Sequence, residues 1–554
     1  MRIDPVVKQP TVTQHLTWLG LPLCLVLLLT GCGGGSGSGT GTGSTGGSTT
    51  TTPDMGVLSP VGDSYQYKLK NAASGMVLGI SGQSQVAGSN AVQETDTSST
   101  DSLWHFMPMN SNQYNVENLL THQVLGISNA STAAGAQALQ WADNGTADHL
   151  WEFYLLTDGN YLIKSVNSGY YLEDAGSGAT SSATIDQGAR ATTGTGCTCQ
   201  EWTLTSTGVS PYTAPFTVTG TGIYVHDPYM LKAADGTYWL YGTHQTLASS
   251  TSTDLSTAVF TYYQGCTPAE KGGWTGYCPI IGPDFPSWTG LQTPKSDNNG
   301  LNIDIWAPSL MFVNGAYYQY YAIPVEPDTA GGEAIIGLAT SVSPSGPWTD
   351  KGWIIQSWSN TTNTPIPGFG FTEGTTANAI DPAPFVDAGG NWWLVWGSWF
   401  DGIHLVQLDP TTGLRLASNT TIYTIAQRGL PSAGEEGPFI YPWNGYYYYF
   451  APINVCCVGD TSTYRIIVGR SQSPTGPYLD RGGLDLKNGG GTILLSAHGN
   501  INGPGGQSVF TDTLSDGTQQ PTLVYHYYDG NNNGTPTLGI NRLAFTSDGW
   551  PYIQ

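Results

Sequence analysis

The chain has 554 residues, of which 10% are charged and 11% aromatic, and it contains 74 glycines and 31 tyrosines. The length allows two or more domains, and so much glycine and aromatic residue favours many short strands and turns over helices. The formal net charge of −23 at pH 7 argues against nucleic acid and strongly anionic polysaccharides as partners, because like charges would repel them. A neutral, hydroxyl-rich partner fits better, although acidity also keeps an exported protein soluble.

Residues 1–31 are typical of a lipoprotein signal peptide and not of a folded domain. Two basic residues precede an uncharged apolar run, Leu16–Leu29, which is shorter than the ~20 apolar residues of a membrane-spanning helix. The run leads into Leu-Thr-Gly-Cys, which resembles the bacterial lipobox and would make Cys32 the lipidation site. Residues 32–58 then form a Gly/Ser/Thr-rich linker. We expect an exported protein, lipid-anchored to the bacterial membrane or cell surface (at the outer membrane or facing the periplasm); an ordinary secretory signal or an uncleaved anchor is the alternative.

Three similar units follow between residues 65 and 204. Leu78-Gly79-Ile80 recurs after 47 residues as Leu125-Gly126-Ile127 and after another 47 as Leu172-Glu173-Asp174. A Leu-Trp or Glu-Trp pair marks each unit, at Trp104, Trp151 and Trp202. Three β-rich repeats of this length resemble the ricin-type β-trefoil, which implies a putative carbohydrate-binding domain over residues 60–207.

The repeated tryptophans of this domain are expected to be core residues more often than sugar platforms. In sugar-binding trefoils an Asp commonly stands where this chain has Gly79, Gly126 and Glu173, and the usual Gln before the Trp is found only at Gln200. The resemblance therefore assigns a competent sugar site at most to the third repeat, with Glu173, Asp174 and Gln200.

A different repeat fills residues 214–554. Each copy begins with a segment that has Pro near its start in four of the five copies, and continues with a turn, often Asp-Gly or Asn-Gly, and an aromatic strand. The starts of the five copies are Asp227-Pro228, Ala307-Pro308, Asp381-Pro382, Gly437-Pro438 and Gly506-Gln507. Repeated antiparallel sheets of this size predict a five-bladed β-propeller, so the fold class is all-β, a trefoil followed by a propeller.

Three of these copies carry a carboxylate at or beside the start: Asp227, Asp381 and Glu436. Because the first strand of each propeller blade lines the central channel, these groups are predicted to meet at its mouth. Crowded carboxylates repel one another and separate their pKa values, so one can remain a proton donor while another remains a base. The alternative is that the acids only cap turns near the axis.

The motifs around these residues resemble those of glycoside hydrolase family 43, especially its endo-1,5-α-L-arabinanases. They are Val225-His226-Asp227-Pro228, Trp306-Ala307-Pro308, Ile380-Asp381-Pro382, Gly397-Ser398, Glu436-Gly437-Pro438, Tyr464–Ser471, Gly503–Ser508 and Tyr525–Asp529. The resemblance implies inverting hydrolysis of plant arabinan, with Asp227 as general base, Glu436 as general acid and Asp381 as the residue that tunes and orients the acid. Glu435 is the alternative acid. Two alternatives remain. The chain is an exo-acting α-L-arabinofuranosidase or β-xylosidase on the same scaffold, or it is a non-catalytic carbohydrate-binding surface protein.

Further residues of the site follow from the same resemblance. Trp306 and Trp399 are candidates for stacking on arabinose and Ser398 for a polar contact, while His226 is expected to neighbour Asp227 without acting as a catalyst. Many arabinanases hold a channel metal, such as calcium, with a histidine where this chain has Gly506; we assign no cofactor and no metal ligand here, and note His526 and His498 only as substitutes. We expect a monomer.

Six cysteines remain once Cys24 and Cys32 are assigned to the export signal. They fall as Cys197/Cys199, Cys266/Cys278 and Cys456/Cys457, and an even number in an exported protein permits disulfides. We expect Cys266 and Cys278 to close a loop.

Overall fold

The computed structural model describes residues 53–554 except 177, 179, 191–195, 245, 264–292, 295–304, 327–333, 358–377 and 429–433. The proposed signal, Cys32 and most of the linker lie outside the described residues, as do Cys266 and Cys278. The two other cysteine pairs are bonded, Cys197 to Cys199 and Cys456 to Cys457. In the part of the chain that is described, no helix has the length and apolar character needed to cross a membrane.

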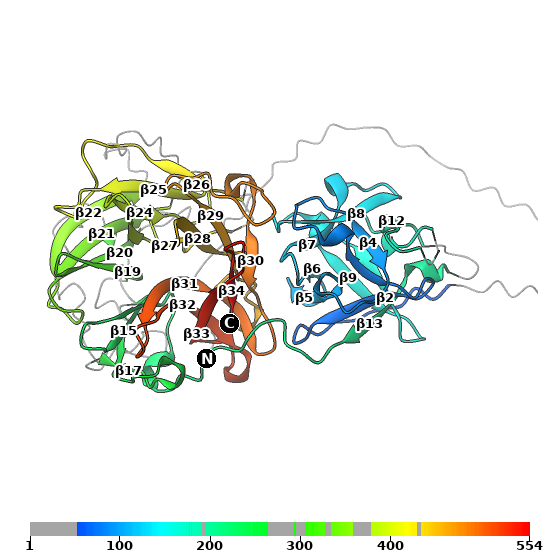
Figure 1. The fold of residues 1–554 in the computed structure, drawn as a ribbon, viewed down its shortest axis with the longest axis horizontal. Helices are drawn as coiled ribbons and strands as arrows, with labels where there is room; N and C mark the ends of the chain where they lie inside the picture. Colours follow the sequence, from blue (N-terminus) through cyan, green and yellow to red (C-terminus); the bar gives the residue numbers. More distant parts are fainter. Residues whose placement is uncertain are drawn as a thin grey trace, which may run out of the picture.

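The structure is all-β and consists of two bodies joined near residue 210 (Figure 1). Helical segments among the described residues are single 3-10 turns, η1 Ser81–Gln83, η2 Thr100–Ser102, η3 Ser128–Ala130, η4 Ala147–His149, η5 Thr198–Gln200, η6 Thr221–Ile223, η7 Leu255–Thr257, η11 Gly459–Thr461, η12 Leu486–Asn488 and η13 Gly530–Asn532. The sequence-based prediction of an all-β trefoil followed by a propeller is confirmed.

The N-terminal body is a single 13-stranded antiparallel sheet closed on itself. Its strands are β1 Val57–Leu58, β2 Tyr67–Asn71, β3 Val77–Ile80, β4 Ala91–Glu94, β5 Trp104–Pro108, β6 Tyr114–Asn118, β7 Val124–Ile127, β8 Ala136–Trp141, β9 Trp151–Leu155, β10 Tyr161–Ser165, β11 Tyr171–Glu173, β12 Asp186–Gly188 and β13 Glu201–Ser206. The second strand of each repeat, β3, β7 or β11, carries the repeated Leu.

One hydrogen bond repeats in all three units of this body. The indole N–H of Trp104 donates to the carbonyl of Leu78 at 2.9 Å, that of Trp151 to Leu125 at 2.9 Å and that of Trp202 to Leu172 at 3.0 Å. All three tryptophans are fully buried in one cluster. The repeat therefore encodes a three-fold core, and each Trp satisfies a carbonyl that burial would otherwise leave unpaired.

The third repeat places its predicted sugar-site residues close together. The side chain of Gln200 donates to Glu173 at 2.6 Å, while Asp174 and Gln200 are each 1% exposed. Glu173 and Asp174 also raise the pKa of the half-buried Asp186, after burial itself, to about 6. Sugar binding by these residues stays a prediction.

The C-terminal body has five antiparallel sheets in chain order. Their strands are β14 Tyr229–Lys232, β15 Tyr238–Gly242, β16 Thr246–Ser250 and β17 Thr261–Tyr262; β18 Thr293–Pro294, β19 Trp306–Val313, β20 Ala316–Glu326, β21 Ala334–Ser341 and β22 Thr349–Ser357; β23 Ala383–Val386, β24 Trp392–Trp396, β25 Ile403–Leu408 and β26 Tyr423–Ala426; β27 Phe439–Trp443, β28 Tyr446–Ile453, β29 Arg465–Ser471 and β30 Thr492–Leu495; and β31 Ile501–Thr513, β32 Gln519–Asp529, β33 Thr535–Phe545 and β34 Pro551–Ile553.

The first full-length strand of each sheet faces a common axis. Strands β14, β19, β23, β27 and β31 contact one another in that order, and β31 contacts β14 again, so they form a closed ring. Sheets arranged radially in this way are the blades of a five-bladed propeller (Figure 1). Residues at the start of these strands are therefore brought to one end of the ring.

Candidate functional site

A positive φ marks one matched position in every blade, shortly before or inside the innermost strand. The φ angles are 49° at Asp227, 40° at Ala307, 56° at Asp381, 51° at Gly437 and 55° at Gly506. Positive φ is uncommon for residues other than glycine and is tolerated best by Asn and Asp, and such strain collects at functional sites. The sequence repeat therefore corresponds to a repeated backbone turn that presents five residues at the channel.

Asp227 is held by groups that stabilise its ionised form. Its Oδ2 lies 2.8 Å from Nδ1 of His226 and accepts the Thr243 hydroxyl at 2.5 Å. Burial alone would raise the pKa of this carboxyl, but His226, His526 and Thr243 hold it well below its usual range. Asp227 is consequently a carboxylate at neutral pH, which is the state that a base requires.

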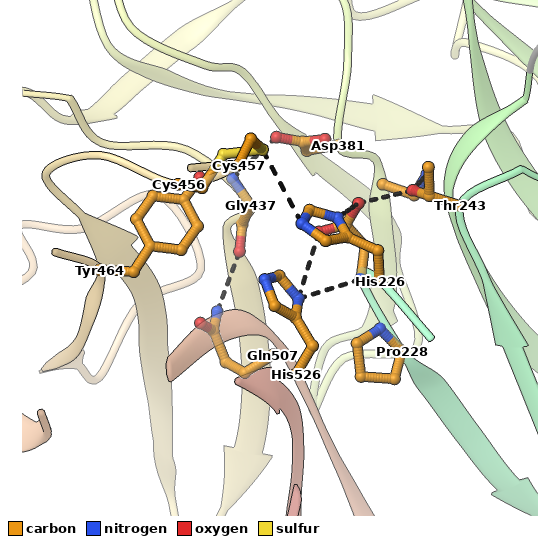
Figure 2. A network of polar contacts seen from close by, with 12 residues as sticks. His226, Pro228, Thr243, Asp381, Gly437, Cys456, Cys457, Tyr464, Gln507 and His526 are labelled. Atoms are coloured by element: carbon orange, nitrogen blue, oxygen red, sulfur yellow. Dashed lines mark hydrogen bonds and ion pairs between the residues drawn. A yellow bond between two sulfur atoms is a disulfide. The ribbon is translucent and has the colours of Figure 1, made fainter. Parts of the chain in front are cut away.

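Two histidines stack beside Asp227 with their rings 3.8 Å apart (Figure 2). Tyr528 accepts the backbone N–H of Cys457 at 2.8 Å and lies 2.8 Å from Nε2 of His226, to which its hydroxyl can donate. Nδ1 of His226 then carries the proton that faces Asp227. His526 accepts the backbone N–H of Asp227 at 3.1 Å, and burial lowers its pKa well below the ordinary value.

Glu436 lies in a different environment. Ser398 donates to its Oε2 at 2.8 Å, the Tyr464 hydroxyl donates to its Oε1, and the Trp399 side chain adds a further hydrogen bond. These donors favour the ionised form, but burial and the negative charge of Asp227 outweigh them, so the pKa of Glu436 is raised. A protonated carboxyl at this position can serve as an acid.

Asp381 interacts electrostatically with the other two carboxyl groups. Its Oδ2 accepts the backbone N–H of Gly437 at 2.9 Å, which fixes the main chain directly after Glu436 (Figure 2). Burial, then Glu436, then Asp227 raise the pKa of Asp381 well above its usual value. The predicted trio thus meets at one site, with Asp227 ionised and a proton retained among the other two groups, as acid–base chemistry needs.

Glu435, the alternative acid, faces a different part of the blade. Its Oε1 accepts the hydroxyl of Tyr449 at 2.7 Å, in the core of the fourth blade. Burial raises the pKa of Glu435 to about 7. It could hold a proton, but it is not among the largest contributions to the pKa values of Asp381 and Glu436.

The three predicted substrate-binding residues lie near this trio. Ser398 is 2% exposed and is engaged with Glu436, while Trp399 is half-buried and would be displaced by any side chain at Gly434. Trp306 is half-buried at the start of β19 and packs near Ile380. Ser398 and Trp399 therefore hold Glu436, and contacts of all three with a sugar stay predictions.

Among the described residues, those near the channel do not offer a free set of metal ligands. His226, Asp227 and His526 have candidate ligand atoms within 4.8 Å of one another, as do His226, Cys456 and Cys457. The cysteines are bonded to each other, both His226 nitrogens face partners, and Nδ1 of His526 accepts a backbone N–H. A side chain at Gly506 would meet Asp227 Oδ1 at 2.4 Å and His526 Nδ1 at 2.7 Å, so His526 fills that space. We derive no step through a metal.

Thr243, Tyr464 and Tyr528 were not assigned roles from the sequence. Tyr464 and Tyr528 stand inside quoted motifs, so a tyrosine in a matched motif was the available signal. Thr243 has none, because it reaches Asp227 only through the β15–β16 turn.

Both bodies of the chain are similar to known proteins. The family model described as Glycosyl hydrolases family 43 matches residues 283–551, and that described as Ricin-type beta-trefoil lectin domain-like matches 57–141 and 147–239. Extracellular endo-alpha-(1->5)-L-arabinanase 1 of Bacillus subtilis is 35% identical over 328 residues, 59% of this chain and 87% of the relative. Arabinan endo-1,5-alpha-L-arabinosidase A of Aspergillus niger is 31% identical over 59% of this chain and 90% of its own length. A solved GH43 endo-arabinanase from Bacillus licheniformis is 33% identical, with a TM-score of 0.48, and covers 61% of this chain and 99% of its own.

Substitution of Gly506 tests how tightly the site is packed. We expect Gly506→Ala to lower the midpoint of thermal unfolding more than Gly517→Ala, because both residues have a positive φ but a Cβ at Gly517 meets open space. The overpacking at Gly506 should add about 1–3 kcal/mol to the cost. Equal midpoints for the two purified variants would contradict the packing around Asp227.

Proposed function

Because the chain belongs to glycoside hydrolase family 43, we propose that it hydrolyses the α-1,5-L-arabinofuranosyl bonds of plant arabinan, with inversion and in the manner of an endo-arabinanase. The observation that carries the proposal is the set of three coupled carboxyl groups at matched blade positions, one stabilised as a base and two with raised pKa values. Relatives whose names specify arabinan support the substrate.

The proposed mechanism divides the work among the three groups. Asp227 accepts a proton from the attacking water, and the ionised state that His226 and Thr243 favour keeps it ready to do so. Glu436 donates its proton to the leaving oxygen, so one O–H bond breaks as the glycosidic bond breaks. An inverting pair needs its carboxyls ~6.5–9.5 Å apart to admit water. Asp381 interacts electrostatically with the acid and holds its main chain through Gly437.

The remaining parts of the chain have supporting roles in this proposal. Trp306 and Trp399 stack on arabinose rings and Ser398 makes a polar contact at the edge of the site. The trefoil binds carbohydrate through its third repeat. The protein is exported, as the name of the Bacillus subtilis relative supports, and a lipid on Cys32 anchors it as a monomer.

Incubation with debranched arabinan, xylan and galactan side by side tests the substrate. We expect reducing sugar to be released from arabinan, with oligomers among the early products on a sizing column. Arabinose as the sole product would instead indicate exo action, and xylose from xylan would indicate a xylosidase. If no reducing sugar is released from any of the three polymers, the proposed hydrolase activity is refuted and a non-catalytic carbohydrate-binding protein is the remaining interpretation.

Conservative substitutions test the assignment of the acid and the base. We expect Asp227→Asn and Glu436→Gln each to lower kcat on arabinan by about 10²–10⁴-fold, because each removes one proton transfer and leaves the shape of the site intact. Glu435→Gln is the matched control, since it changes an adjacent buried carboxyl. Circular dichroism checks that all three fold. If Glu435→Gln is inactive while Glu436→Gln remains active, the role of acid belongs to Glu435.

The pH dependence of kcat/KM tests the raised pKa of Glu436. Activity requires this group protonated, so it falls as pH rises through the raised pKa, whereas Asp227 limits activity only at strongly acidic pH. Ser398 stabilises the ionised acid, so Ser398→Ala should move the alkaline limb to higher pH. The exposed Ser515→Ala should leave the limb in place. A shift to lower pH would contradict the assignment.

A further inference from the structure

We propose that the trefoil positions the catalytic acid of the propeller: Asp143 of the trefoil holds Arg465, and the preceding residue, Tyr464, holds Glu436. This inference rests on the proposed function of Glu436. It gives the N-terminal body a role in catalysis that does not depend on sugar binding, and it makes Asp143 a positioning residue for a reaction in the other domain.

Arg465 is a propeller residue whose charge is matched inside the trefoil. It opens β29, is 1% exposed, and its Nη1 lies 3.2 Å from Oδ2 of Asp143. Its guanidinium also contacts the sulfur atoms of Met107, at 3.4 Å, and Met109, at 2.7 Å. A buried cation needs a compensating charge, so the position of this side chain depends on Asp143.

Asp143 is a buried carboxylate that forms ion pairs with two cations of the propeller. Nη2 of Arg428, which follows β26, lies 3.6 Å from its Oδ1, and both side chains are 2% exposed. Burial alone would raise the pKa of Asp143, but Arg465 and then Arg428 lower it to about 2. The carboxylate therefore stays ionised and joins the edges of the third and fourth blades.

Neighbouring contacts fix the orientation of the two bodies, which lie side by side in Figure 1. The backbone N–H of Ile493 in β30 donates to the carbonyl of His122 at 3.3 Å, and Ile493 packs with Met107 and Val124. The hydroxyl of Tyr212, which lies between the two bodies, donates a hydrogen bond to the carboxylate of the buried Glu117, with both oxygens within 2.9 Å. Ion pairs, hydrogen bonds and apolar packing together hold the trefoil in one orientation relative to the propeller.

The link from this interface to the active site is one residue long. Successive residues of an extended segment point to opposite faces. Arg465 accordingly contacts Asp143 of the trefoil, while Tyr464 belongs to the polar network at the channel (Figure 2). Tyr464 is 4% exposed and donates to Glu436. Its ring leaves no space for a side chain at Gly505, which would lie 2.3 Å away. A shift of the Arg465 backbone must therefore move the tyrosine hydroxyl.

A double-mutant cycle in the full-length chain tests this link, with Asp143→Asn, Tyr464→Phe and the combined variant. We expect Asp143→Asn to lower kcat at least about tenfold with KM changed less than threefold, and to move the alkaline limb of the pH profile upward, as Tyr464→Phe does. The combined variant should be no worse than Tyr464→Phe alone, because both changes remove the same hydrogen bond. Asp158→Asn, exposed on the trefoil, should match the wild type.

Losses that multiply in the combined variant, or an unmoved alkaline limb in Asp143→Asn, would overturn the proposal and leave a purely structural interface. If Asp143→Asn does not fold, Asp143→Glu is used for the same cycle, because it keeps the charge and displaces Arg465 by one methylene. Glu436→Gln in the same assay separates the two levels: full turnover there would refute the assigned acid, whereas a dead Glu436→Gln beside an unchanged Asp143→Asn would refute only the role of the trefoil.

Discussion

The site depends on one repeated backbone constraint, the positive φ at a matched position before or inside the innermost strand of each blade. This turn directs the matched residue toward the channel. Where that residue is glycine, the position is left open for neighbouring side chains. Asp227 and Asp381 accept the strained conformation and supply carboxylates, whereas Gly506 accepts it and leaves space for Asp227 and His526. The same local geometry therefore places two of the three carboxyl groups and leaves the space beside Asp227, while Glu436 directly precedes the matched glycine of its blade.

Much of this arrangement was predictable from the sequence because the repeats carry it. The starts of the five copies, the aromatic strands and the three tryptophans of the trefoil recur at fixed spacing, so fold class and the trio of acids could be inferred from Asp227, Asp381 and Glu436. Contacts without periodicity could not be inferred. Thr243 reaches Asp227 from a turn, and Arg465 meets Asp143 across more than 300 positions of sequence. Ser398 was expected to contact substrate, but its bond to Glu436 is a tertiary feature.

Buried carboxyl groups of this chain fall into two classes by their partners. Asp143 and Glu117 are each surrounded by cationic or hydrogen-bond-donating groups that outweigh burial and lower their pKa values to about 2. Such groups stabilise the folded state above the ordinary carboxyl pKa near ~4 and lose that contribution as pH falls toward 2. Asp381 and Glu436 have the opposite shift, caused by burial and by each other or Asp227. The interface is thus firmly charged over the pH range in which the acid retains its proton.

This division also bears on what the trefoil can present to a polymer. The contacts that fix it to the propeller use Met107, Glu117, His122 and Asp143, from the first and second repeats. Glu173 and Gln200, the pair with a sugar-site pattern, belong to the third repeat and are not engaged by those contacts. A ligand held there would therefore sit at a set distance and angle from the channel, since the two bodies are joined by buried charges. Two sites at a fixed spacing favour a polysaccharide chain that is long enough to occupy both at once. Two sites joined by a flexible linker would not select for such a chain.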